Sequence, residues 1–138
     1  MRRVAVTGVG AVSALGIGVP AFWDGLVAGR SGVRRITRFD PTGYLIEAAA
    51  EVPAFDPTPC FNEAVREFLD PFAQYALVAA AEAWRHAGVE LTDAEHDRSG
   101  VVIGSAFGGV VTQDDQYHRL YARGLTRIHP FSIPRIMN

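Results

Sequence analysis

The chain has 138 residues, of which 49% are hydrophobic and 20% are charged, the balance of an ordinary folded domain rather than of a disordered segment. Its net charge of −2, with no basic block among its 13 arginines, argues against nucleic acid or an anionic membrane as a main partner. The single cysteine, Cys60, cannot form an internal disulfide and fits a reducing compartment, so the cytoplasm is the expected location.

Residues 4–7 (VAVT) have the apolar, β-branched pattern of a buried strand. The following Gly8 and Gly10 loosely match a dinucleotide fingerprint, in which the glycine turn opens a helix that holds a pyrophosphate. Here Gly16 and Gly18 interrupt any such helix. We therefore interpret the first two glycines as a tight turn over the end of the strand, with nucleotide binding as the alternative. No apolar run has the length and composition of a membrane span.

A short helix is predicted over residues 20–28, because Pro20 suits the first turn and Gly29 suits the position after the last. Trp23 is expected in the core. Residues 30–61 then form a long, proline-punctuated connection, which in compact domains is usually functional or wraps over the body. Its Arg34, Arg35 and Arg38 could bind an acidic partner, but a solvated arginine face is the commoner outcome. Cys60 is interpreted as an ordinary thiol.

The clearest helix is predicted from Pro71 to Ala87, with Asp70 as N-cap and Gly88 after its end. Apolar side chains cover most of its circumference, which predicts heavy burial. Residues 92–95 suggest one capped turn. A strand, a helix and a second strand would then form a crossover unit in which residues 4–7 and 101–105 are parallel neighbours.

The second strand has adjacent β-branched residues at 101–103, the pattern of a strand covered on both faces. It ends in a glycine-rich turn, residues 105–109, at the edge where open α/β sheets bind ligands. It is the first place to look for a site, although a plain strand and turn is the alternative. A capping box at residues 112–115 predicts a helix that Gly124 ends. Asp114, Asp115 and His118 have metal-like spacing but are interpreted as solvated helix charges, so no metal site is expected. Residues 128–134 should be extended at both prolines.

Taken together, six blocks of the chain resemble, in order, the N-terminal portion of the β-ketoacyl synthases, the elongating condensing enzymes of fatty-acid and type II polyketide synthesis. These blocks are residues 4–16 (VAVTGVGAVSALG), 22–32 (FWDGLVAGRSG), 36–41 (ITRFDP), 70–80, 102–109 (VIGSAFGG) and 129–134. The resemblance implies an α/β thiolase-like fold. Residues 1–138 would form an incomplete domain, the N-terminal part of the first half, with a parallel β-α-β core and covering helices.

The resemblance also implies a decarboxylative condensation of an acyl thioester with malonyl carrier protein, without a cofactor. An acyl carrier protein and a homodimeric or heterodimeric synthase partner are the implied partners. The family's nucleophilic cysteine lies in a Thr-Ala-Cys-type motif that this sequence lacks, and two histidines assist it. Neither Cys60 nor any histidine here, His86, His96, His118 or His129, matches those positions. No catalytic residue is therefore assigned, and the chain alone is expected to be inactive.

Two other functions remain open. One is a chain-length-factor-like partner subunit, similar in fold but without the cysteine. The other, of a different class, is a nucleotide-binding α/β domain.

The segment just before the long helix departs from the family pattern. The relatives often have basic residues there that are thought to meet the carrier protein, and this chain has Glu63, Arg66 and Glu67. This difference weakens the expectation that the carrier protein docks through that segment.

Finally, the resemblance assigns an acyl pocket. Phe107, in the Gly-Ser-x-x-Gly-Gly turn, would stand at its inner end and favour short primers, with Ile133 and Met137 as apolar wall. The Pro-Phe-x-x-Pro stretch would approach the partner's pocket across a dimer. The alternative for Phe107 is plain core packing.

Overall fold

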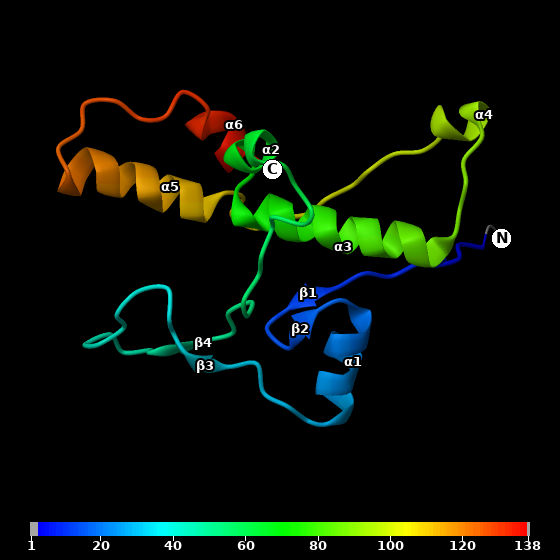
Figure 1. Cartoon of the computed structure of the whole chain (residues 1–138), viewed down its shortest axis with the longest axis horizontal. Helices are drawn as coiled ribbons and strands as arrows, with labels where there is room; N and C mark the ends of the chain where they lie inside the picture. Colours follow the sequence, from blue (N-terminus) through cyan, green and yellow to red (C-terminus); the bar gives the residue numbers. More distant parts are fainter. Residues whose placement is uncertain (1–2, 138) are drawn as a thin grey trace. The chain divides into compact units, whose positions relative to one another are not determined.

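The computed structural model describes residues 3–137, which form two compact units (Figure 1). Unit 1 contains Met1–Asp56 and Val78–Val89, and unit 2 contains Pro57–Leu77 and Glu90–Asn138. The long helix α3, Pro71–Ala87, contributes residues to both.

Unit 1 contains two short antiparallel hairpins and one helix of its own. Strand β1 (Val12–Ser13) pairs with β2 (Gly16–Ile17), and β3 (Arg34–Arg35) pairs with β4 (Ala48–Ala49). Helix α1, Val19–Val27, confirms the predicted helix to within one residue, and Gly29 follows it with φ +62°. The predicted long connection is thus folded back on itself by β3 and β4.

The sequence signals at the ends of α3 are confirmed. Asp70 Oδ1 accepts a hydrogen bond from the backbone N–H of Phe72 at 3.2 Å, and Gly88 after the last turn has φ +59°. A left-handed residue at this position suits glycine, because a Cβ would be strained there.

Unit 2 is otherwise made of short helices. Asn62 caps α2 (Glu63–Phe68), and Thr92 and Glu95 form the predicted capping box of α4 (Asp93–His96). Helix α5 (Val110–Tyr117) continues into the π-helical turn η1 (His118–Ala122), and Gly124 follows with φ +63°, as predicted. The last helix is α6 (Ser132–Ile136).

Two boundary predictions are wrong. Helix α5 begins at Val110 rather than at the expected capping box, and the Thr112 hydroxyl is buried without a hydrogen-bond partner in the part of the chain described. Pro134 lies in the first turn of α6 rather than in extended chain. Proline is tolerated there because the first N–H groups of a helix have no partner within the helix.

The predicted strands at residues 4–7 and 101–103 are not strands here, and residues 3–137 contain no parallel strand pair. Both segments are exposed, as Val4 at 96% and Val102 at 98% illustrate. A strand exists only where a neighbour pairs with its N–H and C=O groups, and neither segment has such a neighbour. The predicted parallel β-α-β core is therefore not formed, although helices and small sheets are both present.

The burial predictions for α3 and for Trp23 are also wrong. No hydrophobic side chain among residues 3–137 is fully buried, Trp23 is 61% exposed, and Trp84 of α3 is 54% exposed. Leu77 of α3 is also exposed, at 42%. The apolar pattern of a helix therefore predicts a face that can be buried. Burial itself also requires another segment that packs against that face.

Candidate functional site

The glycine-rich turn of residues 105–109 is formed in unit 2. Ser105 Oγ accepts a hydrogen bond from the backbone N–H of Gly108 at 2.9 Å, and Gly108 has φ +59°. The side chain of Ser105 thus closes the turn locally. Phe107 stands between them with 80% of its surface exposed.

Gly109 holds the end of this turn against α6. Its backbone N–H donates to the carbonyl oxygen of Ile136 at 3.0 Å, and the residue is buried. A Cβ on Gly109 would lie 2.4 Å from the carbonyl oxygen of Arg135. Only glycine allows this approach of main chain to main chain, which places the start of α5 beside α6.

Asp70 is the most buried acidic side chain, with 1% of its surface exposed. Besides capping α3 through Oδ1, its Oδ2 accepts the backbone N–H of Thr112 in the first turn of α5 at 2.7 Å. One carboxylate therefore satisfies N–H groups at the starts of two helices, where a negative charge is favourable. The sequence indicated the first role; the second joins residues 42 positions apart, and no local pattern predicts it.

The glycines at residues 8 and 10 pack against α3 in unit 1. A Cβ at Gly8 would lie 2.0 Å from the carbonyl oxygen of Ala83, and one at Gly10 would lie 1.9 Å from that of Ala79. The hairpin β1–β2 follows, and the next helix begins only at Val19. A dinucleotide site needs a helix directly after its glycines, so this geometry favours packing over nucleotide binding.

Glu82 of α3 holds main chain of unit 1 in place, a role that the sequence did not indicate. Its Oε2 accepts the backbone N–H of Ala11 at 2.9 Å, and its Oε1 accepts that of Val19 at 2.8 Å. Nearby, His86 Nδ1 accepts the N–H of Val9 at 3.3 Å. The available signal was the row of small residues Ala79, Ala83 and Ala87 at helical spacing, which leaves room for a chain beside the helix.

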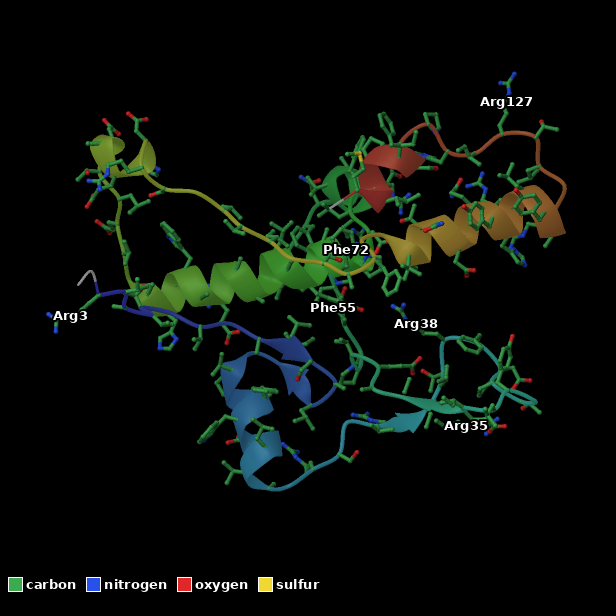
Figure 2. The ribbon with its side chains drawn as sticks, turned by 180° about the vertical axis from the view of Figure 1, so that it is seen from behind. Arg3, Arg35, Arg38, Phe55, Phe72 and Arg127 are labelled. Carbon is green, nitrogen blue, oxygen red and sulfur yellow. The ribbon has the colours of Figure 1, made fainter. Side chains whose placement is uncertain are left out.

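The charges of the β3–β4 hairpin are largely satisfied within it. Arg35 forms ion pairs with Glu47 and with Asp40, and it donates to the Thr42 hydroxyl at 3.1 Å (Figure 2). Hydrogen bonds from Thr42, chiefly from its hydroxyl, lower the pKa of Asp40. Among the three arginines considered for an acidic partner, Arg35 therefore already has acidic partners.

Glu51 is held in a similar way beside the same hairpin. Thr37 donates to its carboxylate from the hydroxyl at 2.7 Å and from the backbone N–H at 3.0 Å, and these bonds lower the pKa of Glu51. Arg38 adds its own backbone N–H at 3.2 Å. The acidic groups here organise the hairpin.

No group of three histidine, cysteine or acidic side chains among residues 3–137 could hold a metal ion. No helix of the described chain combines the length and the apolar character that a membrane crossing requires. Cys60 is exposed and is a free thiol.

Two of the residues predicted for the acyl pocket line separate cavities of unit 2. Met137, 64% exposed, lines a cavity of about 240 Å³ together with Phe72. Phe72 lies at the start of α3 (Figure 2). Ile133, 67% exposed, lines another of about 250 Å³ with Leu120. Phe107 lines neither of these two cavities. Their common pocket stays a prediction.

Comparison with known proteins identifies the family of this chain. The profile of the "Beta-ketoacyl synthase, N-terminal domain" matches residues 1–138. The chain belongs to this family. The chain is 41% identical over 133 residues to "3-oxoacyl-[acyl-carrier-protein] synthase 2" of Coxiella burnetii, and 35% identical over 136 residues to the protein of that name from Staphylococcus aureus strain N315.

Solved structures agree with the family. "The ishigamide ketosynthase/chain length factor" matches 99% of this chain with a TM-score of 0.80 and 33% identity. A β-ketoacyl synthase from Burkholderia phymatum STM815 matches 99% with a TM-score of 0.77 and 29% identity.

The matches cover only part of each relative. The alignments cover 96% and 99% of this synthase chain but only 32% and 33% of the Coxiella and Staphylococcus proteins, so the chain spans about a third of their length. The coverage of the two solved structures is similar, at 34% of each. The chain therefore corresponds to the N-terminal part of the synthases that it resembles.

Proposed function

We propose that the chain is the N-terminal part of a 3-oxoacyl-[acyl-carrier-protein] synthase. The observation that carries this proposal is the family match over residues 1–138, with 41% identity to a protein of that name. The reaction joins an acyl group, held as a thioester on the enzyme, to the α-carbon of malonyl carrier protein. Carbon dioxide leaves, the enolate carbon attacks the acyl carbonyl, and the enzyme thiol is released with the 3-oxoacyl carrier protein as product.

Residues 1–138 would serve this reaction by shaping the acyl site rather than by covalent catalysis. The family's cysteine motif does not occur among them, and in the structure described no hydrogen bond joins the exposed Cys60 thiol to a base. An acyl-transfer nucleophile needs such a base or another means of lowering its pKa. Phe107 on its glycine turn would bound the acyl pocket, with Ile133 and Met137 as apolar wall.

The partners of the proposed synthase are an acyl carrier protein and a second synthase subunit, in a cytoplasmic homodimer or heterodimer. Docking of the acidic carrier through α2 is disfavoured, because Glu63 and Glu67 would repel it. The one basic residue there, Arg66, already faces the Thr58 hydroxyl, 3.4 Å from its Nη1. The carrier would therefore dock mainly on other parts of the synthase.

The test uses the full-length synthase that carries this chain. It is incubated with acyl carrier protein bearing a short acyl group and with malonyl carrier protein, and the 3-oxoacyl product is measured by mass spectrometry. The proposal requires product from the full-length protein and none from the 138-residue chain. Product from the isolated chain, with an acyl group on Cys60, would assign the chemistry to this segment instead.

The second candidate is a chain-length-factor-like subunit. It is supported by the similarity to the ishigamide ketosynthase/chain length factor. Such a subunit would leave the condensation to its partner. A radiolabelled acyl group on the carrier protein would then be transferred to the partner and never to the polypeptide that carries this chain. If that polypeptide is a synthase, it would itself take up the label.

The nucleotide-binding alternative has its own test. NAD or FAD is titrated into the protein while the fluorescence of Trp23 and Trp84 is recorded. We expect no saturable change, since Gly8 and Gly10 are in contact with the main chain of α3. A saturating change that Gly8→Ala abolishes would support a nucleotide site.

A further inference from the structure

Asp70 is unusual among the side chains of unit 2 because it is both buried and charged, and each of its oxygens has a separate backbone partner. The N–H of Phe72 belongs to the start of α3, and the N–H of Thr112 belongs to the start of α5. A carboxylate of this kind forms charge-assisted hydrogen bonds, which are shorter and stronger than neutral ones. The 2.7 Å bond to Thr112 has that character.

This bond lies at one end of the glycine turn. Gly109 is the N-cap of α5, so the turn of residues 105–109 leads directly into the helix that Asp70 holds. The same end of the turn is fixed a second time by the bond from the N–H of Gly109 to the carbonyl oxygen of Ile136. On the other side of Phe107, Ser105 closes the turn onto Gly108.

Phe107 itself has little to hold it. Its side chain is 80% exposed, so packing does not fix its position, and the backbone on either side must do so. On its C-terminal side, the turn is joined to other helices by the main-chain contact to α6 and by the Asp70 carboxylate. Of these, only Asp70 is a side chain that a point substitution can remove cleanly.

We propose that Asp70 is a positioning residue for Phe107: by holding the first turn of α5 from the start of α3, it sets where the phenyl ring stands and thereby which acyl chains the site accepts. This inference rests on the proposed function, in which Phe107 bounds the acyl pocket. It adds a determinant of chain length that lies outside the pocket.

The variant Asp70→Asn separates the two bonds of the carboxylate. An amide has one acceptor oxygen and an NH₂ group that only donates, so it cannot accept both N–H groups. Asparagine is as good an N-cap as aspartate, so we expect its oxygen to keep the cap on α3 and the bond to Thr112 to be lost. Asp93→Asn is the matched control, because it removes the same charge from the first turn of α4 without a bond to α5.

The first measurement is amide hydrogen exchange on the full-length synthase without substrate. Losing the acceptor should raise exchange over residues 105–112 by about 10-fold or more, while the first turn of α3 stays protected. The control should exchange like the parent. Unchanged exchange at residues 105–112 would overturn the proposal, whether or not the protein condenses acyl chains.

The second measurement is kcat/KM for acyl primers of increasing length. We expect Asp70→Asn to change the ratio of short to long primers by about 3-fold or more, in the same direction as Phe107→Ala, since a looser turn no longer holds the ring in place. An equal loss for every primer would overturn the positioning role and make Asp70 a packing residue. Absence of condensation by the parent itself would refute the proposed function, and the exchange result would still decide whether Asp70 anchors the turn.

Discussion

Glu82 Oε1 accepts a hydrogen bond from the backbone N–H of Val19 at 2.8 Å, which fixes the first turn of α1 onto α3 within unit 1. The other oxygen of the same carboxylate holds Ala11, just before the β1–β2 hairpin. One side chain therefore sets the position of a hairpin and of the helix that follows it.

Glu82→Ala should destabilise the full-length protein by about 2–4 kcal/mol, because two partly buried N–H groups lose their acceptor. Glu82→Gln keeps one acceptor and should lose about half of that. Urea denaturation measures the difference, with the exposed Glu90→Ala as control. A Glu82→Ala protein as stable as the control would mean that water replaces the carboxylate without cost.

Gly10→Ala should be far more disruptive than its size suggests. The added Cβ would lie 1.9 Å from the carbonyl oxygen of Ala79, so one of the two main chains must move, at a cost of roughly 3 kcal/mol or more. Gly100→Ala is the matched control, since a Cβ there meets nothing within 4 Å. Equal thermal midpoints for the two variants would show that residues 8–10 are not held against α3 in solution.

The isolated chain should self-associate at micromolar concentration. Val4, Val101 and Val102 are 96%, 86% and 98% exposed, and apolar surface of this kind marks an interaction face or an aggregation liability. Light scattering coupled to gel filtration, together with binding of a hydrophobic dye, measures this. A monodisperse monomer with one sharp thermal transition is the opposite outcome.

Phe107→Ala should extend the range of usable primers in the full-length synthase with little loss on short ones. The reason is volume exclusion, because a close-packed pocket accepts added methylenes only at a cost of roughly 1–3 kcal/mol. Phe39→Ala is a suitable control, since Phe39 is also an exposed ring but lies in unit 1, edge-on to Tyr44. An unchanged product profile would assign Phe107 to packing.

The lowered pKa of Glu51 predicts a local pH dependence. Because its folded pKa lies below the ordinary 4.5, the hydrogen bonds from Thr37 stabilise the hairpin above that pH and are lost as pH falls through the folded pKa. Thr37→Val removes the largest cause and should move the pKa of Glu51 up towards 4.5, as followed by NMR titration of the carboxylate. Thr42→Val is the control: it should raise the pKa of Asp40 and leave Glu51 unchanged.

The elements that the sequence predicted correctly are those specified by neighbouring residues. Asp70, Pro71 and Gly88 delimit α3 because capping and left-handed conformations depend on a few adjacent positions. The strands at residues 4–7 and 101–103 were wrong for the opposite reason: their composition is right, but a strand also needs a partner elsewhere in the chain.

The same distinction applies to the site. The turn around Phe107 was predicted from its glycines, whereas the bond from Asp70 to Thr112 and the contacts of Glu82 were not. These join residues 42 and 71 positions apart. The local pattern around Asp70 was already explained by its role as N-cap, and Glu82 had no local signal of its own. The family resemblance supplied the acyl-pocket residues, whose common cavity stays a prediction.

The contact between Gly10 and Ala79 involves the main chain on both sides, so its spacing does not depend on any side chain. Substitutions on the other faces of α3 can therefore accumulate without altering how residues 8–10 lie along it. A helix fastened in this way is free to diversify its outer surface from one relative to the next. At the contact itself, by contrast, no residue larger than glycine fits at position 10 unless the main chain moves.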